Sequence, residues 1–133
     1  MKKELTVYPA IFTKMNDDGD YYIVDFIDFK DCITEGSTIQ EAYYMAQEAM
    51  GLYLEDLAKF PNLTNDFSNI KLQDNQFISY VSIDMDEYRK KYNNKSVKKT
   101  LTIPCWLDTI AEKENINFSQ ILQEALKSKL EID

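Results

Sequence analysis

The segment from residue 97 to residue 130 changes its apolar period in a way that few folds accommodate. From Val97 to Ile103, apolar and polar residues alternate with the two-residue period of a strand, and Lys99 is the exception on the apolar side. Pro104 ends this run, because proline has no N–H and suits the first turn of a helix. Two stretches with apolar residues at helical spacing follow, separated by a short break at 115–117. The predicted order is therefore strand, helix, turn, helix.

A segment of this kind cannot bury enough apolar surface by itself. Its single strand would also leave a row of backbone N–H and C=O groups unpaired. A second copy removes both difficulties, because two strands can pair antiparallel while four helices interlock. We therefore predict a dimerisation domain whose shared core contains Leu101, Ile103, Leu107, Ile110, Ile121, Leu122 and Leu126.

This arrangement resembles the ribbon-helix-helix family of DNA-binding dimers. The resemblance rests on the alternating Lys98, Thr100 and Thr102, on Ile103-Pro104, and on the Asn117-Phe118-Ser119-Gln120 start of the second helix. In that family the outward strand residues enter the major groove, and the second helix holds a DNA phosphate at its N-terminus. The resemblance implies DNA contacts by Lys98, Thr100, Thr102, Phe118 and Ser119. Taken alone, alternating Thr and Lys could equally be the solvated face of a strand.

Acidic residues concentrate ahead of this segment. Residues 1–94 contain nine basic and 17 acidic residues and carry a net charge of −8, whereas residues 95–133 contain six of each. An acidic body joined to a neutral tail predicts two functions, one of which is to bind a basic partner. The chain is 44% hydrophobic, which is enough to build a core.

Three strands are predicted at the start of the chain. The first begins near Leu5 and ends near Lys14, and the second covers Tyr21–Ile27. The Asp-rich stretch 16–20 contains Gly19, which can adopt a positive φ and so forms the turn between them. Cys32–Thr34 is predicted as a short third strand.

A long helix and a fourth strand follow. Thr38 and Glu41 have capping-box spacing, which predicts a helix that begins there and ends near Ala58. Its expected buried stripe is Ile39, Ala42, Ala46, Ala49, Met50, Tyr53 and Leu57. Residues 59–75 are predicted as a loop and Phe77–Ile83 as a strand, after which Asp84 opens a short helix to about Tyr92.

Residues 26–42 resemble the signature of the HicB antitoxins. In that signature, F-x-D-turn-C-x-T-x-G-x-T-x-x-E-A connects strands two and three to the helix. The matching residues are Phe26, Asp28, Cys32, Thr34, Gly36, Thr38, Glu41 and Ala42, and the Tyr8–Phe12 strand also fits. The chain has Lys30-Asp31 where the family often has Pro-Gly, and the loop 59–75 matches no pattern that we can name.

The two resemblances together imply an α+β protein with two domains. Residues 1–92 would form a partial RNase H-like βββαβ(α) domain, residues 93–96 a linker, and residues 97–133 the ribbon-helix-helix domain. The implied function is that of an antitoxin in a type II toxin–antitoxin pair, which is not an enzyme. It would occlude a HicA-like toxin, a small basic ribonuclease that cuts mRNA, and would bind operator DNA to repress its own operon.

The expected partners are this basic toxin, operator DNA, and a second copy of the chain bound through the C-terminal domain, with larger heteromers formed when toxin is present. We expect the toxin to contact acidic residues of the N-terminal domain, namely Asp25, Asp28, Asp31 and Glu35.

Two other functions fit parts of the sequence. The chain could be a ribbon-helix-helix repressor whose N-terminal domain senses a small molecule. It could also be an RNase H-like nuclease with Asp17, Asp18, Asp20, Asp25 and Asp28 as metal ligands. The first three of these lie in a turn, where Asp is common for backbone reasons. The chain has no His, which excludes Ser-His-Asp and Cys-His arrangements. We therefore expect no catalytic residue, no metal and no cofactor.

The sequence also indicates in which cellular compartment the protein works. No apolar run approaches the 18 residues of a membrane-spanning helix, and no long apolar segment follows the N-terminus. Cys32 and Cys105 lie far apart without a pattern, as is usual in a reducing compartment. We expect a cytoplasmic protein without a membrane span.

Overall fold

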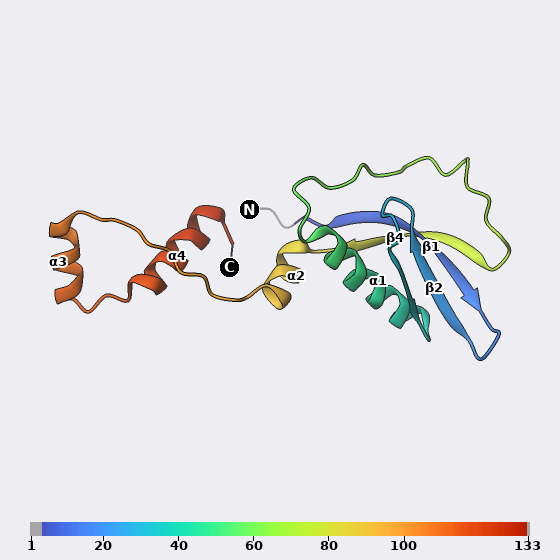
Figure 1. The fold of residues 1–133 in the computed structure, drawn as a ribbon, viewed down its shortest axis with the longest axis horizontal. Coiled ribbons are helices and arrows are strands. Elements are labelled where there is room, and N and C mark those ends of the chain that lie inside the picture. The colour runs from blue at the N-terminus through green and yellow to red at the C-terminus, as the bar shows by residue number, and fades with distance from the viewer. Residues whose placement is uncertain (1–3, 133) are drawn as a thin grey trace. The chain divides into compact units, whose positions relative to one another are not determined.

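The computed structural model describes residues 4–132 and divides them into two compact units (Figure 1). We call residues 4–94 the body and the residues from 95 onward the tail. The first three residues of the predicted domain 1–92, and the last residue of the predicted domain 97–133, lie outside the described residues. Among the helices described, none is long and apolar enough to cross a membrane.

The body contains a four-stranded antiparallel sheet. Its strands are β1 (Thr6–Met15), β2 (Tyr21–Phe26), β3 (Ile33–Gly36) and β4 (Gln76–Ile83), and they lie in the order β3-β2-β1-β4. Gly19 has φ +87 in the turn between β1 and β2, as the predicted hairpin requires. The two edges of the sheet are therefore β3 and β4.

Two helices complete the body, and all six elements occur in the predicted order. The helix α1 (Ile39–Leu54) begins where the Thr38 hydroxyl accepts the N–H of Glu41 at 3.1 Å. The helix α2 (Met85–Tyr92) begins where the Asp84 carboxylate accepts two N–H groups of the first turn. Both N-caps are those predicted from the sequence.

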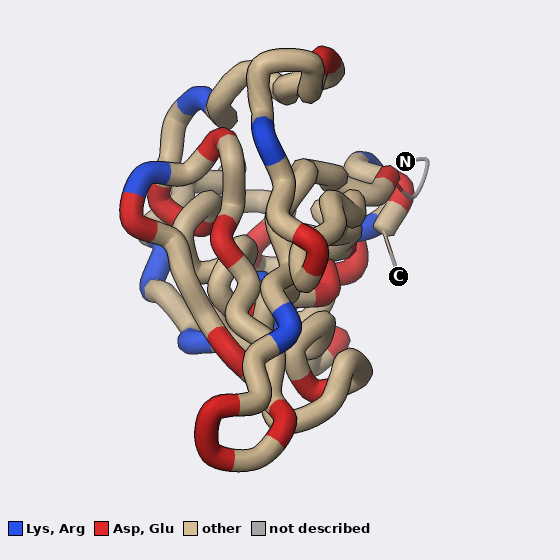
Figure 2. The backbone as a smooth tube through the Cα atoms, turned by 90° about the vertical axis from the view of Figure 1, so that its right-hand side faces the viewer, with Lys and Arg blue, Asp and Glu red and all other residues tan. Residues whose placement is uncertain are grey.

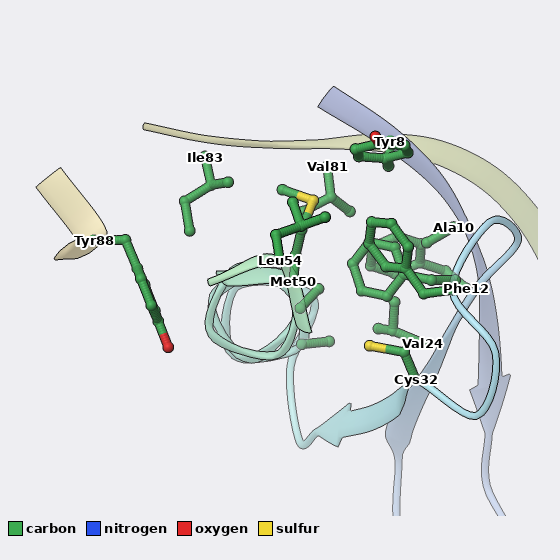
Figure 3. Packing of buried hydrophobic residues seen from close by; sticks show 14 of the residues in the cluster. Tyr8, Ala10, Phe12, Val24, Cys32, Met50, Leu54, Val81, Ile83 and Tyr88 are labelled. Atoms are coloured by element: carbon green, nitrogen blue, oxygen red, sulfur yellow. The ribbon is translucent and has the colours of Figure 1, made fainter. Parts of the chain in front are cut away.

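One hydrophobic core lies between α1 and the sheet, and α2 adds to it (Figure 3). Alternate residues of the strands point into this core, because successive side chains of a strand face opposite sides. The fully buried large side chains in it are Phe12, Val24, Phe29, Met50, Leu54 and Val81. The rings of Phe29 and Tyr53 stack with centroids 4.5 Å apart.

Several predicted boundaries in the body were wrong. The strand β2 ends at Phe26 and not at Ile27, β3 ends at Gly36 and not at Thr34, and β4 begins at Gln76 and not at Phe77. The helix α1 ends at Leu54 and not near Ala58, so Leu54 completes the buried stripe, whereas Ile39 and Leu57 are both exposed. The strand β3 begins at Ile33, because Cys32 belongs to the preceding turn, where its N–H donates to the carbonyl of Phe29.

Two glycines allow close packing around α1. A Cβ on Gly36 would overlap the backbone of Ala42, so the chain can enter α1 this tightly only with glycine there. A Cβ on Gly51 would overlap the ring of Tyr88, which extends from α2 (Figure 3). The second contact is what lets α2 lie against α1.

The tail contains two helices, α3 (Cys105–Lys113) and α4 (Phe118–Leu130), at the predicted positions. Pro104 is the N-cap residue of α3, and the side chain of Asn117 caps α4 by accepting the N–H of Gln120 at 3.1 Å. Residues 97–103 form no strand within one chain. The predicted strand was expected to pair with a second copy, so a single chain does not test it.

Candidate partner-binding and DNA-binding surfaces

Acidic residues occupy the face of the sheet that points away from α1. Asp25 of β2 lies between Ile11 of β1 and Ile33 of β3, and Glu35 lies opposite Ile23. The neighbouring β2 residues Val24 and Phe26 are in the core, which places Asp25 on the opposite face. We call Asp25, Ile33 and Glu35, together with Asp31 of the turn before β3, the acidic sheet face; all four side chains are exposed.

The environment of Asp25 is both partly buried and negative. Burial raises the pKa of the Asp25 carboxyl, and the negative charge of Asp31 raises it further. The Asp25 charge in turn adds to burial in raising the pKa of the Cys32 thiol. Negative potential beside an exposed isoleucine suits a partner surface that offers both cations and apolar side chains.

Asp28 has a different position from the other three predicted toxin contacts. Its carboxylate accepts the backbone N–H of Thr64 at 3.0 Å and also the Thr64 hydroxyl. The structure therefore gives it a role in holding the loop 59–75. Sequence reasoning missed this contact, because nothing in the sequence connects two residues 36 positions apart.

The loop 59–75 covers another part of the same sheet face. Pro9 of β1, which faces away from α1, is fully buried, and it pairs with Tyr80 of β4. The ring of Phe67 packs against the ring of Tyr80 with centroids 6.1 Å apart. The loop thus shields the β1–β4 side of this face and leaves the β2–β3 side, which bears the acidic residues, open.

The carboxylates that could have formed a metal site are spread apart. Asp17, Asp18 and Asp20 lie in the β1–β2 hairpin, where Figure 2 shows acidic positions gathered at the bottom of the view. Asp25 is on β2, and the Asp28 carboxylate accepts a hydrogen bond from the Thr64 hydroxyl. Within residues 4–132, no three acidic or thiol side chains are placed to hold a metal ion.

The predicted DNA-contact residues are all exposed in the tail. Lys98, Thr100 and Thr102 alternate ahead of α3. Phe118 and Ser119 are the first two residues of α4, and the first N–H groups of a helix have no acceptor within it. A polar hollow of about 350 Å³ runs along α4 from its N-cap, lined by Asn117, Ser119, Gln120, Gln123, Glu124 and Lys127. Of this region, the N–H groups at the start of the helix are the part that suits a phosphate group.

The tail helices bury none of their side chains within one chain. No residue of α3 or α4 is buried, although both helices are amphipathic. Leu122 is half-buried, and the other members of the predicted dimer core are 41–63% exposed, namely Leu101, Ile103, Leu107, Ile110, Ile121 and Leu126. An apolar stripe of this extent marks an interaction surface.

This chain is similar to known proteins. Residues 8–126 match the model of a family described as HicB-like antitoxin of bacterial toxin–antitoxin system. A solved structure described as a toxin–antitoxin complex from Streptococcus pneumoniae contains a chain with 33% sequence identity and a TM-score of 0.58. That alignment covers 95% of this chain and 99% of the other. No match was found among curated proteins.

Proposed function

The chain belongs to the HicB-like family of antitoxins of bacterial toxin–antitoxin systems, and from this premise we propose that it has two binding tasks. The body neutralises a HicA-like toxin, an mRNA-cleaving ribonuclease, by direct contact. The tail forms a ribbon-helix-helix dimer that binds operator DNA and represses the operon of the pair. In this proposal the chain works in the cytoplasm as a binding protein without a catalytic step.

The charge of the body supports the first task. Residues 1–94 carry the whole net charge of −8, and the acidic sheet face is left open by the loop. We assign the toxin contact to Asp25, Asp31 and Glu35, with Asp28 acting through the loop that it holds. Opposite charges steer association, so binding should be fast and should slow as salt is added.

The exposure of the tail's apolar side chains is the observation that supports the second task, dimerisation and DNA binding by the tail. The six residues that are 41–63% exposed are spread over residues 101–126, so the segment lacks a core of its own. A second copy would cover them, and pairing of residues 97–103 across the dimer would satisfy the backbone groups of that segment. The paired strands would then present Lys98, Thr100 and Thr102 together.

Both tasks can be tested by dividing the chain. Residues 1–94 and residues 95–133 would each be co-expressed with the toxin encoded in the same operon and purified under non-denaturing conditions. The proposal expects the toxin to remain with residues 1–94. Retention of the toxin by the tail alone would reverse the assigned roles.

The tail is tested by sedimentation. Residues 95–133 are expected to sediment as a dimer, and Leu122→Asp or Leu126→Asp should abolish the dimer, because each buries an unpaired charge. Lys113→Asp, an exposed charge change on α3, is the matched control and should leave the dimer intact. A folded monomeric wild-type tail would contradict the ribbon-helix-helix assignment.

A further inference from the structure

The outer face of α1 combines exposed apolar side chains with acidic ones. Glu41, Met45, Glu48 and Leu52 recur at i, i+4, i+7 and i+11, which places them on one side of the helix. Leu52 is 69% exposed, and the neighbouring Tyr44 is 49% exposed. The sequence of α1 contains no Lys or Arg. This side of the body is therefore apolar and negative, and it is separate from the acidic sheet face, which points away from α1.

A cavity of about 290 Å³ lies beside this face, between α1 and α2. We call it the α1–α2 notch. It is lined by Gln47, Glu48, Ile83, Asp84, Glu87, Tyr88, Lys91 and Tyr92. Three of these side chains are carboxylates, of which Glu87 pairs with Lys90 at 3.5 Å and Asp84 caps α2. The rings of Tyr88 and Tyr92 have centroids 4.7 Å apart. Carboxylates beside aromatic rings are the surroundings that a guanidinium or ammonium group prefers.

The chain already holds one of its own cations at this notch. The Lys91 ammonium is 4.9 Å from the centroid of the Tyr92 ring, 3.8 Å from the Glu48 carboxylate and 3.2 Å from the Tyr44 hydroxyl. The Tyr92 hydroxyl donates to Glu48, which keeps the aromatic wall and the carboxylate together. The negative potential extends deeper, since the charges of Glu55 and Glu48 add to burial in raising the pKa of Tyr88.

We propose that the outer face of α1, bordered by the α1–α2 notch in which Lys91 already sits, forms a second docking surface for the basic toxin. This inference rests on the proposed function, because it assumes that such a toxin exists. Charge complementarity identifies the occupant: α1 carries acidic residues and no basic ones, so a cationic protein gains both ion pairs and contact with Leu52 and Met45, whereas a second acidic body is repelled.

The test measures toxin affinity by calorimetry, with the full-length chain and the toxin from its operon. Leu52→Ser changes an exposed apolar side chain, and Glu48→Gln removes one of the three notch carboxylates, which also contacts Lys91 and Tyr92. Each is expected to weaken toxin binding roughly tenfold or more, as truncation of a central interface residue does. Asp18→Asn in the β1–β2 hairpin is the matched charge control and should change affinity by less than about twofold. Circular dichroism confirms that each variant is folded.

The outcomes separate this inference from the proposed function. Wild-type affinity in both Leu52→Ser and Glu48→Gln would overturn the second surface, and if Asp25→Asn alone weakens binding, the toxin uses only the acidic sheet face. A change in self-association of Leu52→Ser in sedimentation would identify a second copy as the occupant and would also overturn the inference. A wild-type chain that binds no toxin would overturn the proposed function itself.

Discussion

The carboxylate of Asp28 accepts hydrogen bonds from both the backbone N–H and the hydroxyl of Thr64, 36 residues further along the chain. This pair joins the turn after β2 to the loop 59–75. The same loop is held by the Tyr8 hydroxyl, which donates to the carbonyl of Pro61, and by the contact of Phe67 with Tyr80. The loop is thus fixed over one half of the sheet face, and the acidic half remains available to a partner.

We expect Asp28→Ala to lower the free energy of unfolding by about 1–3 kcal/mol, because the Thr64 donors lose a charged acceptor. Thr64→Val should have a smaller effect, since it leaves the backbone N–H in place. Urea denaturation of both variants and of the double variant gives the coupling energy. Strictly additive effects would show that the two residues do not interact.

Gly51→Ala should destabilise the chain even though alanine is the better helix former by about 0.5–1 kcal/mol. The added Cβ meets the ring of Tyr88, and overpacking of this kind typically costs about 1–3 kcal/mol. In a Tyr88→Leu background the ring is absent, so the same Gly51→Ala change should become neutral or stabilising. Thermal unfolding of the four variants measures this, and a destabilising effect in both backgrounds would contradict the packing.

Asp25 should make stability depend on pH. Burial and Asp31 raise the pKa of its carboxyl in the folded chain above the unfolded value, so folding favours the protonated form. The resulting stabilisation is fully present below the unfolded pKa and is lost as the pH rises through the folded pKa. Asp25→Asn should therefore melt higher than wild type at neutral pH and converge with it in acid. Asp18→Asn is the control, and an identical pH profile for both variants would contradict the assignment.

We expect Lys98, Thr100 and Thr102 of the tail to determine sequence discrimination. Thr100→Ala or Thr102→Ala is expected to reduce the preference for operator over random duplex by about 1–3 kcal/mol for each base that the variant no longer recognises. Ser119→Asp should instead weaken binding to all DNA alike, because a carboxylate at the start of α4 repels phosphate. Electrophoretic shifts at two salt concentrations separate the two effects. Unchanged discrimination in Lys98→Ala and both Thr variants would show that residues 97–103 do not read the bases.

The sequence was most informative where local rules decide the structure. The Thr38 and Asp84 caps, the Gly19 turn and the start of α4 after Asn117 all follow from side chain–backbone chemistry within a few residues. The end of α1 was misplaced, because Leu54 and Leu57 both fit the helical period and only the packing of the core selects Leu54.

Long-range relationships could not be predicted in this way. The Asp28–Thr64 pair, the contact of Gly51 with Tyr88, and the placement of Lys91 beside Glu48 each join elements that are distant in the sequence. For the same reason four acidic residues that looked alike in the sequence differ in the structure: Asp25, Asp31 and Glu35 are exposed near one another, whereas Asp28 is engaged by the loop.

Inhibition of the toxin by the full-length chain tests the central claim most directly. The toxin from the same operon would be incubated with mRNA while the chain is titrated, and cleavage would be followed on gels. The account predicts that cleavage stops when the chain reaches stoichiometric amounts, and that Leu126→Asp, which cannot form the tail dimer, inhibits equally well. Undiminished cleavage in the presence of excess folded chain would contradict it.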